Sequence, residues 1–213
     1  MKNTVLTALI VCTSLGVLVF ASTQLHNSLY RLAARNLIEN LQQRNVETFE
    51  SQLFQQLSSS LINTPCANAH DYTTSAKLSQ WNAFLNTSLT TDRTKFLLEK
   101  STWLRPTWSP SYSELASLNG ESHKNRSKQE LLLLSSKFGP YRPSTKLAQI
   151  NFGFSNWELL EQDFRLLSLQ NLLSISSVWR YRPALNQMII YSKGKRRICN
   201  LLTFNQIQVE ACG

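Results

Sequence analysis

Histidine and acidic side chains are scarce in this chain, and their scarcity removes most catalytic chemistries. Among the 213 residues there are only three histidines and 13 acidic residues. None of the histidines, His26, His70 and His123, stands at metal-ligand spacing from another histidine or a cysteine. The sequence also lacks a phosphate-cradling glycine loop, a nucleophile elbow and a paired-carboxylate motif. We therefore expect a protein that is not an enzyme and that holds no cofactor and no metal.

Cysteine is scarce as well, with four residues in the chain. Cys12 lies inside an apolar segment, whereas Cys66, Cys199 and Cys212 lie in the part of the chain that we expect in water. Because three is an odd number, at most one disulfide can form among them. A hydrophobic content of 42% is enough to build a core, so the chain is not of the disordered class.

Acidic residues are outnumbered by 22 basic ones, which gives a net charge of +9 at pH 7. The basic residues are scattered except for one cluster, Lys193, Lys195, Arg196 and Arg197. At the tip of a predicted hairpin this cluster could bind phosphates of DNA or anionic lipid headgroups. It is equally typical of a solvated turn whose positive charge protects an edge strand. We favour the second interpretation, so nucleic acid is not the expected partner.

The longest uncharged stretch runs from Thr4 to Ala21 and contains eighteen residues. At ~1.5 Å per residue it would form a helix of roughly 27 Å, just enough for a hydrocarbon core of about 30 Å. Three interpretations are open: an uncleaved anchor, a secretory signal cleaved after Ala21, or a buried helix of a cytosolic protein. The length of the apolar run favours an anchor over residues 1–23.

Apolar residues recur at spacings of three and four from Gln24 to Leu61, which predicts an amphipathic helix over residues 24–62. Joined to the anchor, it would be a continuous helix of about 55 residues, roughly 80 Å long. Its apolar stripe would pack on the protein's own C-terminal sheet or on other subunits. The expected partner-docking face consists of Leu25, Leu29, Leu32, Leu41, Phe49 and Leu53.

The remaining residues, 63–213, are expected to form one α+β head. Short helices are predicted over 75–84 and 92–100, a surface loop over 103–125, and a strand over 146–154. The segment 127–137 fits a helix or a strand equally well. A further helix is predicted from Asn156, capped by Ser155 or Asn156.

The last forty residues predict two β-hairpins. In the first, strands 187–191 and 196–204 flank a turn in which Gly194 would supply a positive φ. In the second, a turn at Asn205-Gln206 places Cys199 opposite Cys212 in the register that also gathers the apolar side chains on one face. The expected Cα–Cα distance of about 4.5 Å is within disulfide range. We therefore predict a Cys199–Cys212 disulfide, which implies an oxidising compartment.

The run from Val178 to Tyr191, VWRYRPALNQMIIY, resembles a segment of type IV pilin-like proteins, notably minor subunits of MSHA-type pili. The resemblance implies a long N-terminal helix packed on an antiparallel sheet, with the Trp-x-Tyr-x-Pro segment leading into a strand. The chain lacks the pilin processing site, since Gly16-Val17 lies inside the apolar run and Ala21 stands where a glutamate would be.

These observations together predict a non-enzymatic, envelope-anchored structural or assembly component of a pilus or secretion apparatus. It would cross the inner membrane once, with its soluble part in the periplasm or outside the cell, and would bind other subunits through its N-terminal helix. The alternative is a secreted or periplasmic binding module released by cleavage after Ala21.

Overall fold

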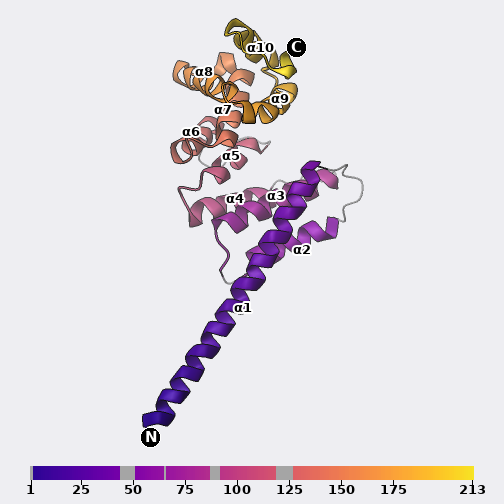
Figure 1. The fold of residues 1–213 in the computed structure, drawn as a ribbon. Helices are drawn as coiled ribbons and strands as arrows, with labels where there is room; N and C mark the ends of the chain where they lie inside the picture. Colours follow the sequence, from indigo (N-terminus) through magenta and orange to yellow (C-terminus); the bar gives the residue numbers. More distant parts are fainter. Residues whose placement is uncertain (1, 44–50, 65, 87–91, 119–126) are drawn as a thin grey trace. The chain divides into compact units, whose positions relative to one another are not determined.

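The computed structural model describes residues 2–43, 51–64, 66–86, 92–118 and 127–213. It is 83% helical, and these residues contain no strand. The expected α+β fold with a C-terminal antiparallel sheet is therefore wrong. The chain divides into two compact units, Met1–Leu104 and Arg105–Gly213 (Figure 1). Each unit has its own hydrophobic core.

The first unit contains α1 (Lys2–Gln43), α2 (Ser51–Ile62), α3 (Ala69–Leu85) and α4 (Asp92–Leu104). The helices predicted over 75–84 and 92–100 are thus confirmed as α3 and α4. A capping box starts α3, in which the Asn68 side chain accepts from the backbone of Asp71 and the Asp71 carboxylate accepts from the backbone of Asn68. The core of the unit joins three helices through Ala34, Leu37, Phe54, Leu57, Leu61 and Leu78.

The continuous helix predicted through Leu61 is wrong, because α2 packs back against α1. Ala34 and Leu61 belong to the same buried cluster, whereas 27 residues of unbroken helix would hold them ~40 Å apart. The part of the predicted apolar stripe that includes Leu37, Leu57 and Leu61 therefore finds its partner within the first unit. The physical reason is burial, since folding the stripe on itself removes apolar surface from water without a sheet or a second protein.

The second unit contains α5 (Ser109–Ser117), α6 (Lys128–Phe138), α7 (Pro143–Ser155), α8 (Gln162–Ser176), α9 (Arg182–Tyr191) and α10 (Lys195–Phe204). Three short 3₁₀ helices, Trp157–Leu159, Trp179–Tyr181 and Glu210–Cys212, connect or end them. Its core is formed by α7, α8, α9, α10 and the C-terminal residues, with Ile150, Phe154, Leu172, Ile175, Leu185, Ile189, Ile198, Leu202, Val209 and Ala211 buried.

Two helices of this unit have a proline in their first turn. Pro110 and Pro143 lie in the first turns of α5 and α7, where the missing N–H of proline costs nothing. The loop predicted over 103–125 is wrong for residues 109–117, which form α5, and its residues 119–125 lie outside the described ranges. The segment 127–137 is a helix, with a Ser127–Glu130 capping box. The helix predicted from Asn156 exists but begins at Gln162, after a 3₁₀ turn.

The predicted strands 146–154, 187–191 and 196–204 are all helical. Buried residues at i and i+4, such as Leu185 with Ile189 and Ile198 with Leu202, fit both a two-residue and a 3.6-residue period. Phe204 distinguishes the two periods, because a period of two would place it on the buried face with Ile198 and Leu202, whereas it is 85% exposed. The pilin-like segment from Val178 to Tyr191 likewise forms a 3₁₀ turn and α9 instead of a strand.

The Cys199–Cys212 disulfide is present, with a Cα–Cα distance of 5.3 Å. The chain turns at Asn205 and Gln206 as expected, and Gln206 has a positive φ of 58°. The bridge joins α10 to the terminal 3₁₀ helix instead of two strands. The pairing was predicted correctly because the position of the reversal was correct, although the register argument that supported it was wrong.

Candidate functional site: the first helix and its surroundings

The part of α1 from Leu9 to Ala21 packs against nothing in the described structure. From Leu9 to Ala21 every side chain is exposed, and the helix is long and apolar enough to cross a membrane. It is the single such helix among the residues searched. In Figure 1 this indigo half of α1 extends beyond α2 and α3. A helix of this kind can be a membrane anchor or a signal sequence.

The C-terminal half of α1 has two contrasting faces. One face is packed on α2 and α3 and includes Asn27, Ala34 and Leu37. At about 100° per residue, the opposite face carries Leu25 and Leu29. These expected docking residues are 64% and 56% exposed, Leu32 beside them is 54% exposed, and Leu53 on α2 is 41% exposed. The side chains of Leu41 and Phe49 lie outside the described residues.

The exposed leucines continue a pattern that begins in the apolar segment. Seven exposed residues follow one another at alternating spacings of four and three, which is the repeat of the contact face of a coiled coil. We call them the α1 stripe: Val11, Leu15, Leu18, Ser22, Leu25, Leu29 and Leu32. The stripe therefore runs without interruption from the apolar segment onto the part of α1 that is packed on the rest of the first unit.

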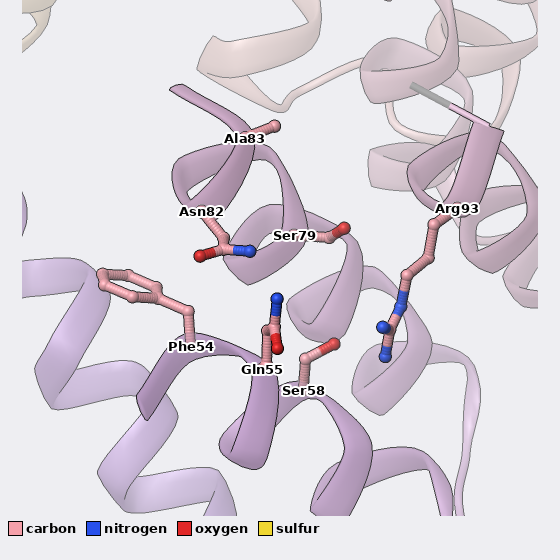
Figure 2. Close-up of a pocket in the computed structure, with 7 residues that line it drawn as sticks. All are labelled: Phe54, Gln55, Ser58, Ser79, Asn82, Ala83 and Arg93. Atoms are coloured by element: carbon pink, nitrogen blue, oxygen red, sulfur yellow. The ribbon is translucent and has the colours of Figure 1, made fainter. Parts of the chain in front are cut away.

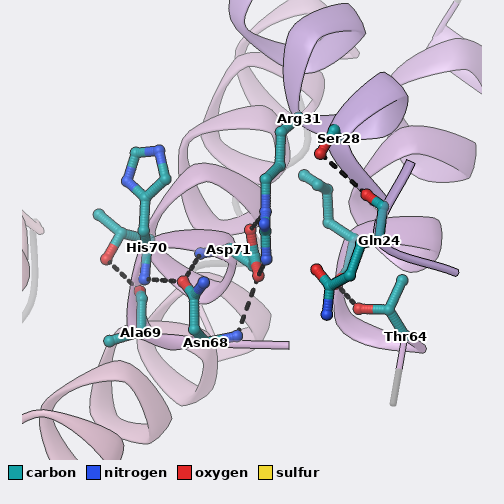
Figure 3. Close-up of polar contacts among 10 residues, drawn as sticks. Gln24, Ser28, Arg31, Thr64, Asn68, Ala69, His70 and Asp71 are labelled. Carbon is teal, nitrogen blue, oxygen red and sulfur yellow. Dashed lines mark hydrogen bonds and ion pairs between the residues drawn. The ribbon is translucent and has the colours of Figure 1, made fainter. Parts of the chain in front are cut away.

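An ion pair holds the packed half of α1 to α3. The Nε and Nη2 atoms of Arg31 each donate to one oxygen of the Asp71 carboxylate, both at 2.7 Å. Asp71 is buried to 1% exposure and also accepts from the backbone N–H of Asn68 at 2.9 Å (Figure 3). A single carboxylate thus caps α3 and fixes the rotation of α1, which determines which face of α1 the stripe occupies.

Two hollows lie between helices of the first unit. A groove of about 530 Å³ between α1 and α3 adjoins Leu32 and is bordered by Arg35, Ile38 and Lys77. A smaller hollow of about 160 Å³ lies between α2 and α3, with Arg93 extending from α4 toward Ser58 (Figure 2).

A third hollow, which we call the polar pocket, lies where the apolar half of α1 ends. It has a volume of about 410 Å³ between α1 and the C-terminal end of α2. Hydroxyl, amide and ring groups line it: Ser22, Thr23, His26, Asn27, Tyr30, Ser60, Asn63 and Thr64.

No family model, curated protein or solved structure matches this chain. Its function is therefore argued from its own residues.

Within the described ranges no group of three or more histidine, cysteine or acidic residues could hold a metal ion. The hydroxyls of Ser109, Ser135 and Thr145 hydrogen-bond to one another in the second unit, where they are buried.

The predicted anion-binding tip is not the tip of a hairpin. Lys193 lies in the turn after α9, and Lys195, Arg196 and Arg197 form the first turn of α10. All four are exposed, and Arg197 donates to Glu158 at 2.7 Å. Gly194 has a φ of −86°, so the expected positive φ is wrong. Glycine is needed there because a Cβ would lie 2.6 Å from the Phe154 carbonyl carbon.

Sequence reasoning missed the polar pocket and the Arg31–Asp71 pair. Asn68 and Asp71 are spaced as a capping box, so the start of α3 could have been found. The partner of Asp71 could not, because Arg31 lies 40 residues earlier in the sequence. The pocket carries no motif, since its residues come from two helices that meet only in the folded unit.

Proposed function

We propose that this protein is a non-enzymatic, single-pass component of a cell envelope that binds a partner through α1. The observation that carries the proposal is the change along α1 at about Ala21. Before that point every described side chain is exposed and almost all are apolar, and after it one face is packed on the first unit. A helix with this division suits an anchor that holds a folded unit at a membrane surface.

The α1 stripe supports the docking part of the proposal. Leu25, Leu29 and Leu32 lie beyond the apolar segment, where exposing three leucines to water is unfavourable. Because the stripe continues from the membrane segment in one line, the partner that fits it is a helix that leaves the same membrane. The heptad spacing is that of helices that pack side by side.

The partner that we propose is a subunit of a pilus or secretion apparatus. Its support is the resemblance of the segment Val178–Tyr191, together with an N-terminal docking helix. The disulfide supports an oxidising compartment, so the folded units would lie in the periplasm or outside the cell, with the anchor in the inner membrane.

Site-specific photo-crosslinking in intact cells tests the docking surface. A photoreactive residue at Leu25 or Leu29 should yield a crosslink to a membrane-anchored subunit of such an apparatus. The matched control is Ser28, an exposed neighbour that lies about 100° around the helix from Leu29. Equal crosslinking from Ser28 and Leu29, or a crosslink only to a second copy of the chain, would contradict the proposed partner.

The alternative function is a binding module released by cleavage after Ala21. One observation favours it, since the packed face of α1 begins near Asn27 and cleavage would leave that packing intact. The intact mass of the protein isolated from its native cells decides between the two. Loss of the first 21 residues would exclude the anchor, and a full-length mass would exclude cleavage.

A further inference from the structure

The smaller hollow between α2 and α3 gathers side-chain donors from three helices. Its polar lining consists of Gln55 and Ser58 on α2, Ser79 and Asn82 on α3, and Arg93 on α4, and we call it the Arg93 hollow. In Figure 2 the amide nitrogens of Gln55 and Asn82 point into the space between α2 and α3, and the guanidinium of Arg93 extends toward Ser58. Because Gln55 and Arg93 are exposed and Asn82 is half-buried, a ligand from solvent can reach these donors.

The donors of the Arg93 hollow are not taken up by ion pairs or by each other. The Oδ1 of Asn82 accepts from the Nδ2 of Asn86 at 2.9 Å, which leaves the Nδ2 of Asn82 for the hollow. The ion pairs among the described residues do not include Arg93. The Ser58 hydroxyl already bonds to Ser75, so it belongs to the lining and not to the available donors. The hollow therefore offers a guanidinium and two amide nitrogens to a ligand.

The lining determines the charge of that ligand. Among the described residues that border the hollow none is acidic, and Arg93 carries a full positive charge. A guanidinium presents its N–H groups in a planar fork that matches two oxygens of an oxyanion, and hydrogen bonds between charged groups are the strong ones. The amides of Gln55 and Asn82 add neutral donors. The Arg93 hollow thus complements an anion with several acceptor oxygens.

The size and polarity of the hollow indicate a small ion. Its volume is about 160 Å³, and apolar lining comes only from Phe54 and Ala83. Pockets for drug-sized ligands have volumes of roughly 300–1,000 Å³ and are lined mostly by apolar side chains. An organic anion would find little surface for its carbon atoms here. A carboxylate has two oxygens, whereas an ion with four can accept from all three side chains at once.

We propose that the Arg93 hollow binds a free tetrahedral oxyanion of the phosphate or sulfate class. Two of its oxygens accept from the guanidinium of Arg93, and the other two accept from Gln55 Nε2 and Asn82 Nδ2. The bound ion links α4 to α2 and α3. No residue of α1 lines the hollow, so this site depends neither on the proposed anchor nor on the α1 stripe.

Equilibrium dialysis of the full-length protein in detergent against radiolabelled inorganic phosphate tests the proposal. The wild type should bind one phosphate per chain in a saturable manner. Arg93→Gln removes the charge and the fork, so it should weaken binding about tenfold or more. Asn82→Leu keeps the side-chain volume and removes a donor, so it should weaken binding about threefold. The matched control is Arg182→Gln, which removes an exposed arginine of the second unit and should stay within about twofold of the wild type.

Unlabelled competitors identify the class of the ion. Sulfate should displace the phosphate, and the ratio of the two dissociation constants shows which ion the site prefers. Acetate at the same concentration should not displace it, and O-phosphoserine should bind no more tightly than phosphate. The site is refuted by the absence of saturable binding in the wild type, by equal losses in Arg93→Gln and Arg182→Gln, or by displacement with acetate. Tighter binding of O-phosphoserine would refute the free ion as the ligand. Circular dichroism confirms that each variant keeps the helical content of the wild type.

Discussion

Asp71 shows how one side chain can determine the geometry of a whole helix. Its carboxylate is buried at 1% exposure and accepts from Arg31 on α1 and from the Asn68 backbone at the start of α3. A buried carboxylate without its cation is strongly unfavourable, so α1 can rotate only by breaking this pair. The outward position of Leu25 and Leu29 therefore depends on a contact made on the other side of the helix.

Replacing Arg31 by leucine should destabilise the first unit by about 2–3 kcal/mol, because it leaves the Asp71 carboxylate buried and unpaired. Arg35→Leu is the matched control. Arg35 pairs with Glu39 at 2.7 Å, but the two side chains are 74% and 51% exposed, so its loss should cost less than about 0.5 kcal/mol. Thermal unfolding in detergent, followed by circular dichroism, measures both. Equal losses would show that the buried pair does not anchor α1.

Gly194 is a second position where a single added atom, a Cβ, should change the stability of the protein. A Cβ there would lie 2.6 Å from the backbone carbonyl carbon of Phe154, and backbone cannot move aside as a side chain can. Gly194→Ala should therefore destabilise the second unit by about 1–3 kcal/mol. Gly213→Ala, whose Cβ would meet its nearest atom at 3.7 Å, should have no measurable effect in the same urea titration.

Among the secondary-structure elements, α9 and α10 explain why the predicted sheet is absent. Leu185, Ile189, Ile198 and Leu202 are all fully buried in one cluster with α7 and α8. Each pair is spaced by four residues, so both helices present their buried residues in consecutive turns. After the Asn205-Gln206 turn the C-terminal residues fold back toward α10, and the Cys199–Cys212 disulfide links them to it.

Removing the disulfide should destabilise the second unit by about 2–3 kcal/mol, the expected effect of releasing a loop with a sequence separation of 13 residues. The variant is Cys199→Ala with Cys212→Ala, compared with the wild type by urea unfolding without reductant. Cys12→Ala with Cys66→Ala is the control, since both are free thiols and exposed. Reductant should lower the stability of the wild type and of the control, and leave the Cys199/Cys212 variant unchanged.

On the scale of the whole molecule, the chain consists of two units with separate cores. The first unit includes the candidate anchor, and the second carries the disulfide and the basic first turn of α10. A core that is complete within one unit can be stable without the other. The boundary after Leu104 is therefore a place where the protein can be divided for study.

Residues 105–213 expressed alone in an oxidising compartment should form a helical domain that unfolds cooperatively with the disulfide intact. Circular dichroism and non-reducing mass mapping of peptides check both properties. A fragment of residues 127–213 is the control, because it lacks α5, which supplies the buried residues Tyr112 and Leu115. The shorter fragment should melt at a lower temperature, and equal melting would show that α5 does not belong to this unit.

The sequence by itself determined the features that depend on local composition or on one reversal of the chain. Eighteen uncharged residues are enough to predict an apolar helix, the helices predicted over 75–84 and 92–100 correspond to α3 and α4, and the Asn205-Gln206 turn brought Cys199 to Cys212. Only the tertiary structure decided whether Ile198 and Leu202 belong to a strand or a helix, because a spacing of four suits both. It alone placed α2 back on α1, paired Arg31 with Asp71, and left Asn27 Nδ2 without an acceptor. These contacts join residues that are distant in the sequence, and no local pattern specifies which surfaces will bury each other.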